Sequence, residues 1–139
     1  MNELDGEGRT PLIVACANGQ TRIVDFLCQA GADADIKDNR GLAAIHHCVL
    51  GVKTNGSGMA ATCVRALAKN NANIDRKTAD GLTALHLAVK MNLVDISYVL
   101  KDVGADVNKF STEGYNAIHY GVVNTLSKER AVENIKQVR

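Results

Sequence analysis

The glycine-rich stretch "GVKTNGSG", Gly51 to Gly58, has the spacing of a phosphate-binding loop and is the first candidate for chemistry. Such a loop follows a buried strand, and Lys and Ser or Thr come directly after its second glycine, where the lysine reaches the β- and γ-phosphates. Here Ser57 and Gly58 follow Gly56, Lys53 lies inside the stretch, and an apolar helical segment precedes it. The stretch is predicted not to bind phosphate, and nucleotide binding there is kept only as a rival hypothesis.

Three histidines, His46, His86 and His119, occupy equivalent positions in segments of similar sequence. No nucleophile or carboxylate recurs beside them, as catalysis would require, so a structural role is favoured. His47 lies about 100° further around the same helix than His46, and the sequence assigns it no role. No catalytic residue is predicted, and the chain is predicted not to be an enzyme.

The cysteines never form a C-x-x-C motif and lie in apolar helical patterns, which is typical of buried free thiols. A zinc site of Cys48 with His46 or His47 lacks a second pair of ligands at metal-site spacing. No metal and no cofactor is therefore predicted. The four cysteines are Cys16, Cys28, Cys48 and Cys63.

The composition narrows the class of protein. Its 16 basic and 15 acidic residues are interspersed and give a net charge of +1, without the basic run that nucleic-acid binding requires. No apolar stretch approaches the roughly 18 residues of a membrane span, and the acidic start "MNELDGEGR" is unlike a secretory signal. We expect an intracellular, cytoplasmic chain of 139 residues, with a nuclear location left open.

An internal repeat is the main signal in the chain. The segments "GRTPLIVA", "GLAAIHHC", "GLTALHLA" and "GYNAIHYG" begin at residues 8, 41, 81 and 114, which are 33, 40 and 33 residues apart. A second anchor recurs in phase as "GADAD", "NANID" and "GADVN", from residues 31, 71 and 104. Two anchors that keep one period indicate a chain built from about four copies of one unit.

Each copy predicts a pair of helices. A glycine in a polar turn precedes a first helix, which Thr10 or Thr83 caps and in which Pro11 suits the first position. Gly19 or Asn92 makes the turn to a second helix, because both residue types tolerate left-handed backbone. Apolar residues recur along that second helix at helical spacing, as Ile23, Phe26 and Leu27 and as Ile96, Val99 and Leu100.

These units resemble the ankyrin repeat. Its T-P-L-H-x-A signature appears as "TPLIVA", "AAIHHC", "TALHLA" and "NAIHYG", and its G-A-D-V-N signature is complete at Gly104 to Asn108. The resemblance implies an all-α solenoid of stacked helix pairs with projecting β-hairpin loops, and histidines that bond the neighbouring hairpin. Ile13, Ala43 and Asn116 replace signature residues, so the Thr–His hydrogen bonding of the family is expected to be lost there.

The period divides a domain of residues 5–139 into repeats at about 5–37, 38–77, 78–110 and 111–139. The second repeat carries seven extra residues near 51–58, between its two helices. We expect them to form a mobile loop, either a second contact site with Lys53 and Asn55 at its tip or merely tolerated length. Val132, Ile135 and Val138 lie on one face of a polar last helix, as in a capping repeat.

Ankyrin repeats use their hairpin fingers and inner helices as a concave surface for a protein partner, and the resemblance implies the same here. Arg9, Leu42, Leu82 and Tyr115 follow the signature glycines in register, and charged residues, Lys37, Arg40, Lys77 and Asp80, flank them. An apolar stripe with a polar rim is typical of a binding face; the alternative is that Leu42 and Leu82 cover the adjacent repeat. The predicted partner-binding residues are Arg9, Leu42, Leu82, Lys90, Met91, Phe110 and Tyr115.

The resemblance thus implies a protein–protein interaction module or scaffold, without nucleic-acid binding or membrane insertion. It is expected to be a monomer or part of a longer repeat array, because the first repeat has no evident cap. The alternative is a regulatory or targeting segment of a larger enzyme or channel whose catalytic part lies elsewhere. Asn108, eight residues after Leu100 and next to Val107, resembles the pattern that asparaginyl hydroxylases recognise, and is a candidate for hydroxylation.

Overall fold

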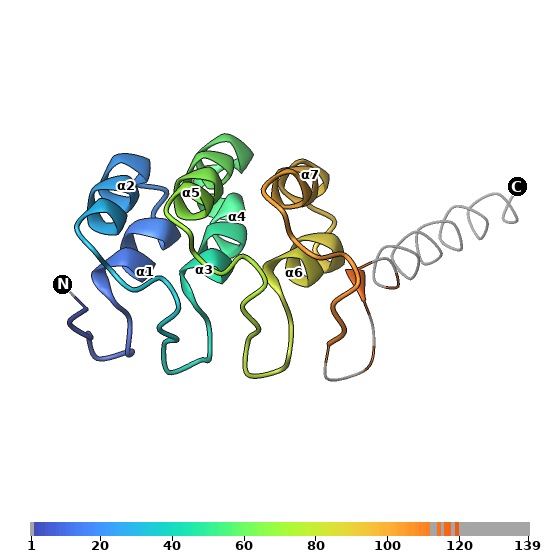
Figure 1. Cartoon of the computed structure of the whole chain (residues 1–139), viewed down its shortest axis with the longest axis horizontal. Helices are drawn as coiled ribbons and strands as arrows, with labels where there is room; N and C mark the ends of the chain where they lie inside the picture. The colour runs from blue at the N-terminus through green and yellow to red at the C-terminus, as the bar shows by residue number, and fades with distance from the viewer. Residues whose placement is uncertain (1, 112–113, 115, 118, 120–139) are drawn as a thin grey trace, which may run out of the picture.

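The part of the protein that the structure describes is all-helical, as predicted, and its helices lie in two rows (Figure 1). The computed structural model describes residues 2–111, 114, 116, 117 and 119, and within these it has seven helices and no β-strand. An inner row lies beside the projecting loops and an outer row lies behind it. The inner helices are α1 (Pro11–Ala17), α3 (Ala44–Leu50) and α6 (Ala84–Lys90), and the outer helices are α2 (Thr21–Gln29), α5 (Ser57–Lys69) and α7 (Val94–Asp102), with the short α4 (Val52–Asn55) between α3 and α5.

Capping residues start the inner helices where the sequence predicts. The Thr10 hydroxyl accepts a hydrogen bond from the Ile13 N–H at 3.1 Å, and the Thr83 hydroxyl accepts one from the His86 N–H at 3.2 Å. Each bond satisfies one of the N–H groups that the first turn of a helix leaves without a partner. Asn92 makes the α6–α7 turn with φ of 59°, as predicted for a residue that tolerates left-handed backbone.

The three departures from the signature have different consequences. Ala43 has no side-chain oxygen for the first turn of α3, as expected, and Ile13 is a buried apolar residue of α1. The prediction for Asn116 is wrong: its side-chain oxygen accepts from the His119 N–H at 3.0 Å, and its own N–H donates to His119 Nδ1 at 3.0 Å. An asparagine oxygen can cap a helix as well as a threonine hydroxyl does, so the bonding pattern survives that replacement.

The hydrophobic core runs along the stack between the two rows of helices. Each helix pair packs against the next one, α1 on α3 and α2 on α5, then α3 on α6 and α5 on α7. Small residues of the inner helices allow this close approach, while aliphatic residues of the outer helices fill the space behind them. Fully buried core residues include Val24, Ala44, Val49, Val64, Leu67, Ala84, Ile96 and Leu100.

The seven extra residues of the second repeat do not form the mobile loop that we expected. Residues 52–55 form α4, and α5 begins already at Ser57, which makes it 13 residues long against 9 for α2 and for α7. Gly56, with φ of 86°, supplies the sharp turn between α4 and α5. The Asn55 amide donates to the Ala17 carbonyl at 2.7 Å, so the insertion packs against the first repeat. The insertion is therefore ordered and connects repeat two to repeat one through this hydrogen bond.

Replacing Asn55 by alanine tests this contact between the insertion and the first repeat. The change removes the donor to the Ala17 carbonyl and should lower the free energy of unfolding by about 1 kcal/mol, as measured by urea denaturation. The matched control is Lys53→Ala, which alters an exposed side chain of the same short helix and should change stability by less than about 0.5 kcal/mol. Equal effects of the two variants would contradict packing of the insertion through Asn55.

Candidate functional site: the fingers and the histidine ladder

Three turns, which we call fingers, project on one side of the stack at residues 5–9, 38–42 and 78–82. In each finger the N–H of the first residue donates to the carbonyl of the last, and the side chain of the first residue accepts from the N–H of the last. Each turn is therefore closed twice at its base and has a fixed shape. The closing pairs are Asp5 and Arg9, Asp38 and Leu42, and Thr78 and Leu82, with backbone N···O distances of 3.0, 2.9 and 2.8 Å.

Neighbouring fingers also contact one another. The Asn39 N–H donates to the Glu7 carbonyl at 3.0 Å, which joins fingers one and two. Gly41 lies so close to finger three that a Cβ added there would come within 2.7 Å of the Ala79 Cβ. Its φ of 78° is also a conformation that glycine adopts readily and other residues rarely do. The fingers form one continuous edge.

Two histidines of the inner helices tie each helix to the following finger, as predicted. His46 Nδ1 accepts from the Ala43 N–H at 3.0 Å, and its Nε2 lies 3.2 Å from the Leu82 carbonyl oxygen. His86 repeats the arrangement, with the Thr83 N–H at 2.9 Å and the Lys109 carbonyl at 2.8 Å. Because Nδ1 accepts, the proton of the neutral ring is on Nε2, which donates to the carbonyl.

Burial keeps these rings neutral. The His46 side chain is fully buried, and desolvation lowers its pKa from 6.5 to about 4. Burial also lowers the pKa of His86. Both ring nitrogens of each residue are engaged by backbone groups, so neither histidine has a nitrogen left to act as a general base. These two residues, His46 and His86, which we call the histidine ladder, therefore have a structural role: they fix the positions of the fingers.

His47, to which the sequence assigned no role, forms a buried pair with Asp38 of finger two. His47 Nε2 lies 2.8 Å from Asp38 Oδ2, and both residues are buried. Burial acts to raise the pKa of the Asp38 carboxyl, but hydrogen bonds from the Leu42 N–H, the His47 ring and the Arg40 N–H hold it below its ordinary value. The pair fastens finger two to α3. Across the residues that the structure describes, no group of three metal-ligating side chains is present.

A polar hollow of about 280 Å³ opens between fingers one and two. Glu7 and Arg9 line it from finger one, Asp38 and Arg40 from finger two, and His47 from α3. Arg9 Nε lies 3.2 Å from Glu7 Oε2. The hollow mixes charges of both signs and was not expected, since its residues are far apart in the sequence and no motif connects them.

The two leucines at equivalent finger positions, Leu42 and Leu82, differ in exposure. The Leu42 side chain is only 8% exposed, whereas Leu82, in the same register, is half-buried. The alternative, that the residue covers its neighbours within the stack, fits Leu42. Leu82 retains a surface that a partner could contact, while Leu42 has almost none.

The remaining predicted contact residues differ in accessibility. Phe110 is 52% exposed, and its ring centroid lies 6.4 Å from that of His119. Lys90 is exposed at the end of α6, and Met91 and Arg9 are half-buried. Tyr115 lies outside the described residues, as do Val132, Ile135 and Val138 of the predicted capping helix.

Asn108, the candidate for hydroxylation, is exposed in the turn after α7. Its backbone N–H donates to Asp106 Oδ1 at 2.8 Å, which holds the turn. The side chain is thus on the surface, but nothing in the structure tests modification, and hydroxylation stays a prediction.

Comparison with known proteins agrees with the geometry. Two family models match, one described as ankyrin repeats in many copies over residues 2–48 and one as three copies over residues 52–135. Human transient receptor potential cation channel subfamily A member 1 is 30% identical over 147 residues, covering 100% of this chain and 12% of the channel subunit. Human neurogenic locus notch homolog protein 1 is 31% identical over 86% of this chain and 4% of its own length.

A third relative, the nuclear factor NF-kappa-B p105 subunit of Gallus gallus, is 28% identical over 82% of this chain and 11% of its own length. The chain thus spans only a small part of each of these relatives. None of the helices that the structure describes has the length and apolar character needed to span a bilayer. The repeated helix pairs, the histidine ladder and the family matches together establish that the chain belongs to the ankyrin-repeat family.

Proposed function

We propose that this chain is a protein–protein interaction module that presents the concave side of its fingers and inner helices to a protein partner. Ankyrin repeats generally serve as protein-interaction modules. The observation that carries the proposal is the fixed shape of the fingers: each is closed twice at its base, finger two is bonded to finger one, and finger three is bonded to α3. A surface that is already ordered loses little conformational entropy when it binds.

The contact surface that we propose lies toward the later fingers. Leu82, Met91 and Phe110 offer partly or largely exposed apolar side chains, and exposed Lys90 precedes Met91 at the end of α6. Aromatic residues surrounded by a polar rim are often the residues that contribute most to binding. Arg9 and Tyr115, of which Tyr115 lies outside the described residues, belong to the same proposal as predicted contact residues. The rim consists of the exposed side chains of Arg40, Lys77 and Asp80.

The chain binds and does not catalyse, in this proposal, because the ladder histidines are occupied by backbone groups. In this proposal its setting is intracellular, in the cytoplasm or the nucleus, which fits the four cysteines that occur as free thiols.

A double variant tests the contact surface. Leu82→Glu with Phe110→Glu should weaken partner binding on the order of 1000-fold, since each of two central apolar contacts is worth about 2 kcal/mol. Partners are captured from a native lysate with immobilised chain, identified by mass spectrometry, and titrated against each variant by calorimetry.

The matched control places the same charges on the outer row. Val94→Glu with Tyr98→Glu alters two exposed apolar residues of α7 and should leave both affinity and circular dichroism unchanged. If the control weakens binding while the Leu82 and Phe110 variant binds fully, the partner contacts the outer helices and the proposal is wrong.

A second candidate is a regulatory or targeting segment within a larger protein. Its support is the likeness to a cation channel subunit over 100% of this chain, which corresponds to only 12% of that subunit. Sequencing the full transcript tests it: an open reading frame that encodes a channel or enzyme domain beside these repeats favours the candidate, and one that encodes repeats alone excludes it.

A further inference from the structure

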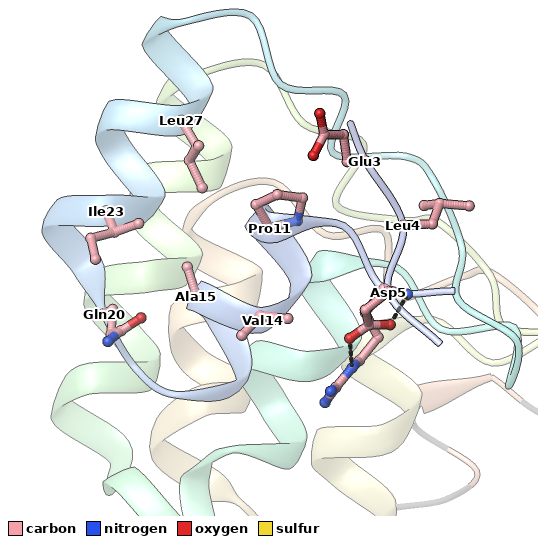
Figure 2. A pocket seen from close by; sticks show the side chains of 10 residues that line it. Glu3, Leu4, Asp5, Pro11, Val14, Ala15, Gln20, Ile23 and Leu27 are labelled. Atoms are coloured by element: carbon pink, nitrogen blue, oxygen red, sulfur yellow. Dashed lines mark hydrogen bonds and ion pairs between the residues drawn. The ribbon is translucent and has the colours of Figure 1, made fainter. Parts of the chain in front are cut away.

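The polar hollow between fingers one and two lies where the chain departs from its own repeat pattern. The position of His47 in α3 is held by Val14 in α1 (Figure 2) and by Leu87 in α6. The position of Asp38 in finger two is held by Thr78 in finger three. Of the inner helices and fingers that the structure describes, only α3 and finger two thus supply a His–Asp pair.

This pair is unfavourable as a purely structural element. The side chains of His47 and Asp38 are only 10% and 3% exposed, so both have lost most of their contact with water. Well-packed apolar residues in place of a buried ion pair are often as stable or more stable, and repeat three has Leu87 and Thr78 at these positions. Ionisable side chains that are kept buried at a hollow are candidates for a functional site.

The pair holds the backbone of Arg40 in place. Asp38 Oδ2 lies 2.8 Å from His47 Nε2. Asp38 Oδ1 accepts from the N–H of Arg40 at 3.0 Å and from that of Leu42 at 2.9 Å. In finger three, within the described part of the chain, the Thr78 hydroxyl accepts only from the N–H of the last residue. The middle residue of finger two is therefore fixed by a hydrogen bond that finger three lacks.

The bonding capacity that remains open in the hollow is that of guanidinium groups. The side chain of Arg40 makes no ion pair among the described residues. Arg9 Nε donates to Asp5 Oδ2 at 2.9 Å (Figure 2) and lies 3.2 Å from Glu7 Oε2. Because the Glu7 side chain is 71% exposed, its ion pair is weak and can be displaced. Both oxygens of the Asp38 carboxylate are already bonded, so the hollow suits a hydrogen-bond acceptor better than a cation.

We propose that this hollow binds an acidic side chain of the protein partner, which replaces Glu7 at Arg9 and bonds Arg40. A carboxylate has the planar pair of acceptors that the guanidinium fork matches. Asp38 and His47 are positioning residues, which act through the backbone of Arg40. The inference rests on the proposed function and deepens it, because it names the chemistry of the partner segment that lies at fingers one and two.

Short peptides test the occupant. The probes are a glycine peptide blocked at both ends with a central glutamate, the same peptide with a central glutamine, and an all-glycine peptide with a free carboxyl terminus. They are titrated at low salt into the isotope-labelled chain and followed by NMR. The glutamate peptide should shift the N–H signals of Asn39 and Arg40 saturably, with a Kd on the order of 1 mM, and the glutamine peptide should not.

Three outcomes of these titrations would overturn the proposal. No saturable shift, or equal shifts with glutamate and glutamine, would mean that the hollow does not recognise a carboxylate. Tighter binding of the all-glycine peptide would assign the hollow to the end of a chain instead of an acidic side chain.

Substitutions copied from repeat three locate the site. Arg40→Asp reproduces Asp80 at the equivalent position and should weaken binding of the glutamate peptide about tenfold or more. The matched control, Arg22→Asp, reproduces Asp95 and makes the same change of charge on the outer helix α2, so binding should stay the same. Glu7→Gln removes the competing carboxylate and should strengthen binding about threefold. Equal losses in the two arginine variants would indicate attraction by net charge alone and contradict the site.

The double variant Asp38→Thr with His47→Leu separates positioning from stability. It reproduces Thr78 and Leu87 of repeat three, so its urea midpoint should equal or exceed that of the parent. Binding of the glutamate peptide should nevertheless fall about threefold or more, because Arg40 loses its anchor. A lower midpoint with unchanged binding would make the pair purely structural and overturn its assigned role. The peptides are titrated without the partner, so failure here leaves the apolar contact surface, which its own double variant tests.

Discussion

Lowering the pH from 6.5 to 4 should reduce the free energy of unfolding by about 3 kcal/mol through His46 alone. The His46 pKa is about 4 in the folded protein, because the ring is buried, and an unfolded histidine has a pKa of about 6.5. Between these values the unfolded chain binds the extra proton and the folded chain does not, so stability rises with pH. Protonation of Nδ1 would also remove the acceptor for the Ala43 N–H.

Urea denaturation at half-unit steps of pH measures the effect. The expected slope is about 1.4 kcal/mol per pH unit for one proton, and His86, whose pKa burial also lowers, adds to it in the same direction. Well above pH 6.5 both the folded and the unfolded chain have a neutral His46, so the free energy of unfolding no longer changes with pH through this residue. The pKa of Asp38 is lowered below the ordinary carboxyl value, so its own stabilisation is lost only at lower pH than the range from 6.5 to 5.

The matched variant is His46→Gln, which keeps an amide donor and acceptor but has no titrating group. It should be less stable than the parent at pH 7. Between pH 6 and 5 its free energy of unfolding should fall less steeply than that of the parent, by about 1.4 kcal/mol per pH unit. If the parent and the variant show the same slope, His46 is not held neutral by burial, and the account of the ladder fails.

Much of the fold could be predicted because the repeat reports it directly. Two anchors that keep one period define the helix pairs, and Thr10 and Thr83 mark where the inner helices begin. The role of His46 also follows, since its position recurs at His86. Features that every unit shares occur several times in one sequence, so comparison of the units is enough to predict them.

Features that occur once were harder to predict. Gly56 and Gly58 suggested a loop, yet Gly56 makes a single turn between α4 and α5, and Asn55 fixes the segment through a carbonyl 38 residues away. His47 and Asp38 meet only because finger two folds back over α3. Leu42 and Leu82 share a register but differ in burial, a difference that the repeat pattern does not contain.

Gly41→Ala should lower the free energy of unfolding by about 2–5 kcal/mol, the other large effect that we expect. An alanine at φ of 78° costs about 1–2 kcal/mol in backbone strain. Its Cβ would also lie 2.7 Å from the Ala79 Cβ and 3.0 Å from the Ala79 backbone nitrogen, so fingers two and three would have to separate. Overpacking of this kind adds about 1–3 kcal/mol.

Gly31→Ala separates these two costs. Gly31 has a φ of 96°, but a Cβ there would meet no atom within 4 Å, so this variant carries the backbone strain without the clash. It should lose only about 1–2 kcal/mol in the same urea experiment. The difference between the two variants measures how firmly fingers two and three are pressed together, and equal losses would mean that they are not.

That difference bears on function, because the contact surface that we propose depends on the spacing of the fingers. If Gly41→Ala separates fingers two and three, Leu82 moves relative to Arg9 and Arg40 of the earlier fingers even though no contact residue has changed. Partner affinity should then fall in Gly41→Ala and stay near the parent value in Gly31→Ala. Both affinities are measured without urea, at a temperature at which each variant is fully folded. Equal affinity in both variants would place the partner on one side of the gap between fingers two and three, since only a contact that spans these two fingers responds to their separation.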